Sequence, residues 1–166
     1  MRVELRSVAG SQFQEVRVST FSTLPLVALC NAVWGKDARV NGNFKKRVVI
    51  RETESERWTY EQVRVPLVKD RDYVMFVRRV AQAESGRCEI VFETRDEPGY
   101  PVRGDHVRIP VVRGRWTLDP APDGRTSIAY QIYSEPGGLV PAVFARGGQC
   151  SAAVDFMKTI LARATQ

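Results

Sequence analysis

The region from Phe44 to Ser134 constrains the fold of this chain most, because turn-forming residues divide it into short runs rich in β-formers. The turns are marked by groups of Pro, Gly, Asp, Glu and Ser, for example at 84–86 and 96–99. Strands joined by such short turns pair antiparallel with their neighbours, so we expect an antiparallel meander. The runs between the turns predict strands at 44–53, 57–65, 71–83 and 87–95, and a long hairpin at 104–134.

A hairpin and a short helix are predicted ahead of this region. Apolar and polar residues alternate at 3–5 and again at 16–18, on either side of a turn-like Ala-Gly-Ser sequence, which is typical of two paired strands. Ser22 and Thr23 then precede a proline and an apolar stripe, a pattern that predicts a capped helix over 24–34.

The C-terminal segment supplies a cover for the sheet. From Gly138 to Ala164 apolar residues recur at helical spacing, which predicts one long amphipathic helix. A sheet of this kind needs an apolar partner against its concave face, and the helix can provide it. The predicted fold class is therefore α+β, with a curved antiparallel β-sheet wrapped around a long C-terminal α-helix.

Length and charge limit the classes of function. A chain of 166 residues predicts one domain over residues 1–166, and a charged share of 27% is that of an ordinary globular protein. The net charge of +6 favours anionic surfaces, including phospholipid headgroups and nucleic acid. The densest basic cluster, Lys45-Lys46-Arg47, lacks the interleaved aromatic residues of a single-strand binder. We therefore expect no nucleic acid partner, but transient contact with an anionic membrane surface.

The cysteines and the N-terminal residues bear on the compartment. Cys30, Cys88 and Cys150 lie far apart in the sequence and form no CxxC or Cys/His pattern. An odd number of cysteines with apolar neighbours favours buried, reduced thiols in a reducing compartment. Residues 1–10 carry no apolar run of the kind found in a signal peptide. The expected location is the cytoplasm.

No pattern predicts catalysis, a metal or a cofactor. His106, the single histidine, stands beside Asp105 rather than a nucleophile, and we expect it at the surface. The adjacent Arg71 and Asp72 would point to opposite faces of a strand, which favours a structural turn with ion pairing. No two metal ligands have a recognised spacing, and the paired glycines fit no phosphate-binding loop.

Four longer strings resemble one known family. They follow the family's order and are distributed between residues 15 and 143; the most specific is a Pro-Gly-Gly-Leu-Val-Pro turn before the terminal helix. The chain is similar to the steroidogenic-acute-regulatory-protein-related lipid transfer (START) family, in its bacterial single-domain form. The strings are EVRVSTFSTLPLVALCNAV at 15–33, VPLVKDRDYV at 65–74, FETRDEPGYPVRGDHVRI at 92–109 and GRWTLDPAPDGRTSIAYQIYSEPGGLVPAV at 114–143.

The resemblance implies a helix-grip fold with an internal apolar cavity that binds one hydrophobic molecule, a lipid, fatty acid or sterol-like compound, without catalysis. Some family members keep a buried Glu and Arg pair facing the ligand. Here Glu61 matches the acid, but Val77 stands at the position of the arginine. Arg79 is one candidate partner for Glu61. Glu61 is then either a polar contact for the ligand or a solvated acid at the rim.

Inward-facing rows of residues, taken with the resemblance, give the expected ligand-binding residues. Residues of this kind are more often plain core than ligand contacts, because an apolar stripe needs no cavity to explain it. Tyr73 and Tyr130 stand out, because a buried phenol needs a hydrogen-bond partner that a ligand can provide. The loop at 96–101 is the expected gate. The full set is Glu61, Val63, Tyr73, Met75, Val77, Arg79, Phe92, Ile109, Tyr130, Ile132, Phe144 and Met157.

Two other functions stay open. The first is an enzyme with the same architecture, such as a polyketide cyclase, which needs polar groups inside the cavity within reach of a reacting atom. The second is a protein-interaction module whose pocket has collapsed and whose sheet edge or basic face binds a partner. A monomer is the favoured state of the chain.

Overall fold

The computed structural model describes residues 1–35, 44–65, 68–82, 86–138 and 142–166, without the side chains of 81, 82 and 142–147. Within these residues the chain forms one nine-stranded sheet and two helices. The elements are β1 (Arg2–Ser7), β2 (Gln14–Ser22), α1 (Leu26–Trp34), β3 (Phe44–Glu52), β4 (Glu56–Val63), β5 (Arg71–Gln82), β6 (Arg87–Thr94), β7 (Val107–Arg108), β8 (Val111–Pro120), β9 (Thr126–Glu135) and α2 (Ala142–Arg163).

The sheet is antiparallel along its main path, in the order β1-β2-β9-β8-β6-β5-β4-β3. The predicted meander is present from β3 to β6 and in the hairpin of β8 and β9. The N-terminal hairpin does not continue it, because β2 pairs with β9. The predicted hairpin at 104–134 is too long at its start: β7 leaves it and pairs parallel with β5.

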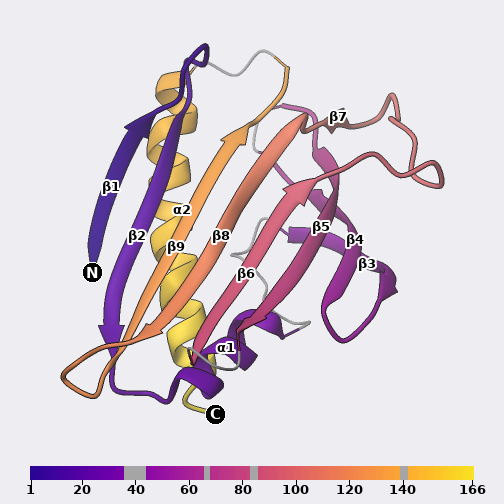
Figure 1. The fold of residues 1–166 in the computed structure, drawn as a ribbon. Coiled ribbons are helices and arrows are strands. Elements are labelled where there is room, and N and C mark those ends of the chain that lie inside the picture. The colour runs from indigo at the N-terminus through magenta and orange to yellow at the C-terminus, as the bar shows by residue number, and fades with distance from the viewer. Residues whose placement is uncertain (36–43, 66–67, 83–85, 139–141) are drawn as a thin grey trace.

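Helix α2 lies across one face of the curved sheet, and α1 sits at one end of that face (Figure 1). The main core forms where α2, α1 and the strands β2, β6, β8 and β9 meet, around fully buried residues such as Trp116 and Met157. A smaller core cluster around Met75 and Ile109 lies under the other half of the sheet. The predicted curved sheet around a C-terminal helix is therefore confirmed.

The N-terminus of α1 differs from the prediction. Pro25 is the N-cap residue, and no side chain caps the helix. The hydroxyl of Ser22 accepts a hydrogen bond from the backbone N–H of Leu24, at 3.1 Å, and so shapes the turn before the helix. The proline at this position costs nothing, because the first helical N–H groups have no partner within the helix.

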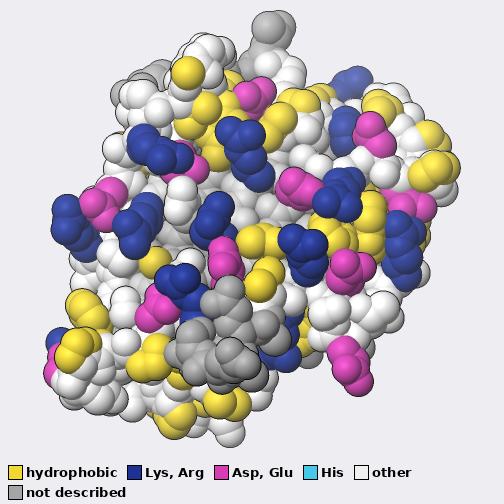
Figure 2. Space-filling view, in the orientation of Figure 1, with side chains coloured by type: hydrophobic (Ala, Val, Ile, Leu, Met, Phe, Trp, Pro, Cys, Tyr) yellow, Lys and Arg dark blue, Asp and Glu magenta, His cyan; other side chains and the backbone are white. Residues whose placement is uncertain are grey.

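The outer face of the sheet, opposite α2, is a mixed charged surface. Figure 2 shows basic and acidic side chains interleaved over this face. Several of them pair across neighbouring strands, as in Arg6 with Glu15 at 2.8 Å and Arg115 with Glu89 at 3.3 Å. Such exposed pairs contribute little to stability, so this face mainly keeps the sheet hydrated.

Neither described helix combines the length and the hydrophobicity needed to cross a lipid bilayer.

Candidate functional site

A cavity of about 200 Å³ lies between the sheet and the two helices, where the two core clusters meet. Val77, Phe92 and Ile132 pack against both clusters and line the cavity. The full lining is Val33, Trp34 and Gly35 of the α1 end, Phe44 and Arg47 of β3, Arg57, Thr59 and Glu61 of β4, Tyr73, Met75 and Val77 of β5, Ile90 and Phe92 of β6, Val112 and Trp116 of β8, Tyr130 and Ile132 of β9, and Phe156 of α2.

A larger depression, of about 410 Å³, lies on the outer face of the sheet. It is lined mainly by five arginines and two glutamates, and it faces the solvent. Ligand sites for hydrophobic molecules are concave and mostly apolar, with a few converging polar groups. The inner cavity has these properties and the outer depression lacks them, so the inner cavity is the candidate site.

One wall of the cavity is polar and is organised around Glu61. Its side chain is buried, with 4% of the residue exposed, and its carboxylate accepts hydrogen bonds from three side chains. These are Arg47 Nε at 2.8 Å, Thr59 Oγ1 at 2.9 Å and the hydroxyl of Tyr73 at 2.7 Å. Burial, together with the Glu61 charge, holds the pKa of Tyr73 well above its ordinary value. The buried carboxylate is thus paired with a cation and hydrogen-bonded by protein groups rather than by solvent.

Two sequence-based expectations for Glu61 are wrong, the solvated position at the rim and the pairing with Arg79. It is no solvated acid at the rim, and its cation is Arg47 rather than Arg79. The sheet register explains this, because Arg47 of β3 and Tyr73 of β5 stand directly opposite Glu61 on its two sides. Arg79 lies six residues beyond Tyr73 along β5, which is roughly 20 Å of extended strand.

A second arginine occupies the same side of the cavity. Arg57 is buried and donates two hydrogen bonds to Oε1 of Glu52, from Nε at 2.9 Å and from the terminal Nη2 at 2.8 Å. Its guanidinium also lies over the ring of Trp34, 4.7 Å from the ring centroid. Arg57 is thereby held between the sheet and the end of α1, and it joins the polar wall to the helix.

Another part of the lining is aromatic. The rings of Trp116 and Tyr130 stack with their centroids 4.4 Å apart, and Phe156 of α2 meets both rings edge-on. Phe92 lies against the free side of Tyr130, at 5.9 Å. Such contacts fix the orientation of large side chains at little entropic cost. This wall is rigid and presents ring faces and edges to the cavity.

The hydroxyl of Tyr130 has no hydrogen-bond partner among the described residues, although the residue is 5% exposed. Burial raises the pKa of Tyr130, followed by the charge of Glu61, and no hydrogen bond contributes. A buried phenol usually finds a partner. Tyr130 lines the cavity, so this donor is available to a molecule bound there.

The structure brings together seven of the twelve residues that the sequence predicts for ligand binding. These seven line the cavity: Glu61, Tyr73, Met75, Val77, Phe92, Tyr130 and Ile132. Val63 and Ile109 belong instead to the smaller core cluster beside it, and Met157 is fully buried in the main core. Arg79 turns to α1, and the side chain of Phe144 lies outside the described residues.

The sequence-based set omitted several lining residues. Arg47 was assigned only to the basic cluster Lys45-Lys46-Arg47, because no pattern in the sequence gives its register against Glu61. Trp116 and Phe156 belong to the apolar rows of a strand and a helix. Their large side chains were the one feature of the sequence that could have marked them as lining residues. The C-terminal end of α1, with Trp34, could not be placed, since nothing in the helix shows which strands it packs against.

The loop at 96–101, the expected gate, contributes no residue to the cavity lining. It is held instead by contacts with β7 and β4. Arg108 donates to the backbone oxygens of Tyr100 and Pro101, at 3.0 and 3.1 Å, and the ring of Tyr100 stacks on that of Tyr60. The opening of the cavity must therefore be sought elsewhere.

The adjacent Arg71 and Asp72 lie at the start of β5 rather than in a turn, and the expected ion pairing is present for Asp72. Asp72 is fully buried and pairs with Arg108, Nε to Oδ1, at 2.9 Å. Arg71 donates to backbone oxygens on both sides, including that of Lys69. The expectation of a surface position for His106 is wrong, because its side chain is 9% exposed.

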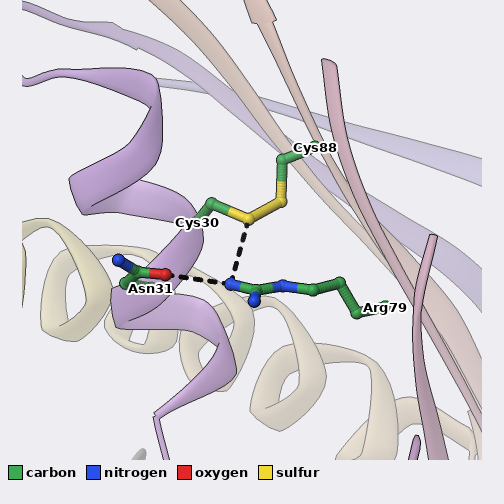
Figure 3. The surroundings of a disulfide bond; sticks show 4 residues. All are labelled: Cys30, Asn31, Arg79 and Cys88. Carbon is green, nitrogen blue, oxygen red and sulfur yellow. Dashed lines mark hydrogen bonds between the residues drawn. A yellow bond between two sulfur atoms is a disulfide. The ribbon is translucent and has the colours of Figure 1, made fainter. Parts of the chain in front are cut away.

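The expectation of three reduced thiols is wrong for two of them. Cys30 of α1 and Cys88 of β6 form a disulfide, and Cys150 is free. The two half-cystines are 58 residues apart in sequence, but the packing of α1 on β6 brings their Cα atoms to 6.1 Å. Figure 3 shows the disulfide beside Arg79, whose terminal nitrogen Nη2 lies 3.5 Å from Cys30 Sγ and 2.9 Å from Asn31 Oδ1. Because disulfides persist in oxidising compartments, the cysteines do not support the expected reducing compartment.

Comparison with solved structures identifies the class of fold. A STAR-related lipid transfer protein from Xanthomonas axonopodis is similar over 99% of this chain and 93% of its own, with a TM-score of 0.82 and 24% identity. Human StAR-related lipid transfer protein 5 reaches a TM-score of 0.81 at 15% identity, over 99% of this chain and 81% of its own. The fold is therefore the helix-grip fold of START domains, as the resemblance in sequence predicts.

The same architecture extends to an enzyme. An aromatase/cyclase from Streptomyces has a TM-score of 0.60 and 13% identity, over 91% of this chain and 93% of its own.

Two sequence relatives are also found. An uncharacterised protein of Pseudomonas aeruginosa is 26% identical over 163 residues, which are 95% of this chain and 79% of that protein. Rho GTPase-activating protein 7 of Rattus norvegicus is 26% identical over 111 residues, which are 66% of this chain but 10% of that protein. No family model matches the chain.

Proposed function

We propose that this protein binds one hydrophobic molecule, a lipid, fatty acid or sterol-like compound, in the cavity between the sheet and the helices, and releases it unchanged. The observation that carries the proposal is the composition of the cavity: apolar and aromatic side chains line most of it, and among them lies the hydroxyl of Tyr130, which has no hydrogen-bond partner in the part of the chain that the structure describes. Neighbours in fold that are titled lipid transfer proteins support the same class of ligand.

The lining also defines the polarity of the ligand. Met75, Val77 and Ile132 offer apolar contact, which stabilises a bound molecule by about 25 cal/mol for each Å² of apolar surface buried. On the polar wall Glu61 already has three donors, so it does not require a cation from the ligand. The ligand is therefore mostly apolar, with one hydrogen-bond acceptor that meets Tyr130.

The size of the cavity sets a further condition. Sites for drug-sized molecules have volumes of about 300–1,000 Å³, whereas this cavity has about 200 Å³. A small apolar molecule fits without a change in the protein. A ligand as large as a sterol requires one wall to move outward, and the end of α1 is a wall made by a short helix.

The direct test is to look for the ligand. Native mass spectrometry and solvent extraction of freshly purified protein should show a bound hydrophobic molecule. Titration with a dansyl-labelled fatty acid and with a fluorescent sterol should show saturable binding. A protein that is consistently empty and binds neither probe would overturn the proposal.

A substitution tests the location. Val77→Trp should fill the cavity and reduce probe binding at least about tenfold, since its added rings occupy the space of the ligand. Val91→Trp is the matched control, because Val91 lies on β6 and lines the depression on the outer face of the sheet. Equal binding by both variants would place the ligand elsewhere.

The enzyme alternative is less well supported. General acid–base catalysis needs a group whose pKa lies near the working pH. The phenols that line the cavity have pKa values raised by burial, and Glu61 is engaged by three donors. The cyclase-like neighbour supports the shared fold, and conversion of the extracted ligand by the purified protein would be the result that favours an enzyme.

The interaction module predicts a collapsed pocket, and the cavity does not favour it. Release of the ligand through transient contact with an anionic membrane is part of the proposal, because the chain carries a net charge of +6. Binding to vesicles that contain phosphatidylserine should then weaken as salt is added, since salt screens this attraction. Absence of any binding at low salt would remove the membrane from the proposal.

A further inference from the structure

The disulfide between Cys30 and Cys88 joins the two elements that close one end of the cavity. Cys30 lies one turn before Trp34 on α1, and Trp34 with its neighbours Val33 and Gly35 forms a cavity wall. Cys88 lies on β6, two residues before Ile90, which faces the same cavity. The crosslink thus fixes the position of this wall relative to the sheet.

A continuous set of contacts leads from the sulfur atoms to the cavity. Arg79 Nη2 contacts Cys30 Sγ at 3.5 Å, and the Arg79 guanidinium lies 5.4 Å from the centroid of the Trp34 ring. Arg57, which lines the cavity, lies over the same ring at 4.7 Å. Trp34 is therefore in contact with one arginine of the disulfide region and with one of the cavity.

The helix has few other attachments. It has nine residues, of which Leu29, Cys30 and Ala32 are buried. A helix this short is marginal in water and depends on its packing for stability. Breaking the crosslink would leave α1 held by these apolar contacts and by the contacts of Asn31 and Trp34 with arginine side chains, without a covalent bond to the sheet.

We propose that the Cys30–Cys88 disulfide is a reducible latch: while it is intact, α1 is fixed against β6 and the cavity stays small, and its reduction by a dithiol frees α1 and opens the cavity. The consequence for ligands rests on the proposed function, whereas the freeing of α1 does not.

The surroundings of the disulfide allow the reaction. A surface depression of about 450 Å³ is lined by both half-cystines, by Arg79 and by Val27 of α1. It provides an approach for an incoming thiolate, although both cysteines are largely buried. Among the residues that the structure describes, Arg79 is paired with no carboxylate. A cation beside a sulfur stabilises its thiolate form.

These features assign the two sulfurs different roles. An incoming thiolate attacks Cys88 Sγ and forms a mixed disulfide, while the bond to Cys30 breaks and its electron pair goes to Cys30 Sγ, beside Arg79. The second thiol of the reductant loses its proton and attacks the mixed disulfide, which releases Cys88. The reductant leaves as a disulfide, having supplied two electrons, and its two protons pass to the cysteine sulfurs or to water.

The first experiment tests the latch chemically. Alkylation of the native, untreated protein after denaturation should label one cysteine, and prior treatment with dithiothreitol should raise this to three. Arg79→Gln should slow the reduction by at least about threefold, because the leaving thiolate loses its cation, and Arg79→Lys should restore most of the rate. Three labelled cysteines without reductant, or equal rates in all three proteins, would overturn the proposal.

The second experiment tests the movement of α1 without any ligand. Reduction, or the double substitution Cys30→Ser with Cys88→Ser, should speed hydrogen exchange of the α1 amides at least about tenfold while β8 and β9 keep their protection. Cys150→Ser is the control, because this cysteine is outside the disulfide. Unchanged exchange in α1 would overturn the latch.

The third experiment separates the latch from the proposed function. With the dansyl-labelled fatty acid as probe, the reduced protein should release it at least about tenfold faster than the oxidised protein, as expected when a wall is freed. Equal release rates would overturn the control of the cavity by the disulfide. If neither form binds the probe but α1 still becomes free on reduction, the proposed function fails and the latch on α1 stands.

Discussion

Tyr130 is the residue that we expect to hydrogen-bond to the polar group of the ligand. Tyr130→Phe should weaken binding of a ligand that bears a hydrogen-bond acceptor by about 2- to 10-fold, the value of one neutral hydrogen bond. Stability without ligand should be unchanged or slightly higher, because the hydroxyl has no partner among the described residues to lose. Binding is measured by probe titration and stability by urea unfolding.

The neighbouring Tyr133 is a matched control on the same strand. Its hydroxyl hydrogen-bonds to Ser11, at 2.7 Å, and to Glu135, and it does not line the cavity. Tyr133→Phe should therefore lower stability and leave ligand affinity unchanged. Unweakened binding by Tyr130→Phe would show that this hydroxyl does not contact the ligand.

The pair of Arg47 and Glu61 makes a separate prediction. Arg47→Met removes the cation from a carboxylate with only 6% of its side chain exposed, and should lower the free energy of unfolding by about 3 kcal/mol. The double variant Arg47→Met with Glu61→Leu should recover part of this loss, because no buried charge then remains without its cation. Both are measured by urea unfolding, and costs that simply add would contradict a coupled pair.

At the scale of elements, replacement by alanine should have opposite effects on stability at two glycines, one in a helix and one in a strand. Gly148 lies in α2 and is exposed, and an added Cβ there would meet nothing within 4 Å. Gly148→Ala should therefore raise stability by about 1 kcal/mol through helix propensity. Gly114 in β8 is different, because an added Cβ would collide with the backbone oxygen of Gln131 and with the ring of Phe92.

Gly114→Ala should lower stability by about 1–3 kcal/mol, since the strand or the Phe92 ring must shift. Thermal unfolding of both variants beside the wild type checks the pair. Stabilisation of the protein by Gly114→Ala would mean that β8 and β9 are less closely apposed than the structure indicates.

The strands could be predicted from the sequence more accurately than their pairing. The predicted strands at 44–53, 57–65, 71–83 and 87–95 lie within two residues of β3 to β6. The register of β3 on β4 could not be predicted, because it shifts between Val49 and Arg51. If the pairing of Glu52 with Arg57 continued along both strands without a shift, Val48 would stand opposite Glu61. The bulge brings Arg47 to this position instead.

At the scale of the whole molecule, the buried phenols predict how stability depends on pH. Burial first, and then the Glu61 charge, raise the pKa of Tyr73 well above its ordinary value of 10.0, and the pKa of Tyr130 is raised by the same causes. The folded protein thus holds these protons more tightly than the unfolded chain. The stability they contribute is complete below about pH 10 and is lost as the pH rises through the folded-state values.

The expected outcome is cooperative alkaline unfolding in which Tyr73 and Tyr130 ionise only as the sheet is lost. Tyrosinate absorbance and far-ultraviolet circular dichroism, followed together as the pH is raised above about 10, measure this. Ionisation of all five tyrosines well before the circular dichroism changes would show that Tyr73 and Tyr130 are accessible to solvent in the folded state.

The sequence by itself determined the strands, the two helices, the faces that are buried and the class of fold. These depend on residues two to four positions apart, so alternation, helical spacing and turn residues reveal them directly. Seven of the residues predicted to bind a ligand line the cavity for the same reason, since an inward-facing row follows from alternation once its strand is placed.

Tertiary structure alone decided the pairing of β2 with β9, the partner of Glu61, the disulfide and the volume of the cavity. Each of these depends on segments that are distant in sequence and on how the sheet curves and shifts its register between them. A one-residue bulge in β3 places Arg47 rather than Val48 opposite Glu61. The packing of α1 on β6 brings together two cysteines that are 58 positions apart in the sequence. No local pattern carries that information, because it is set by the contacts of the folded chain.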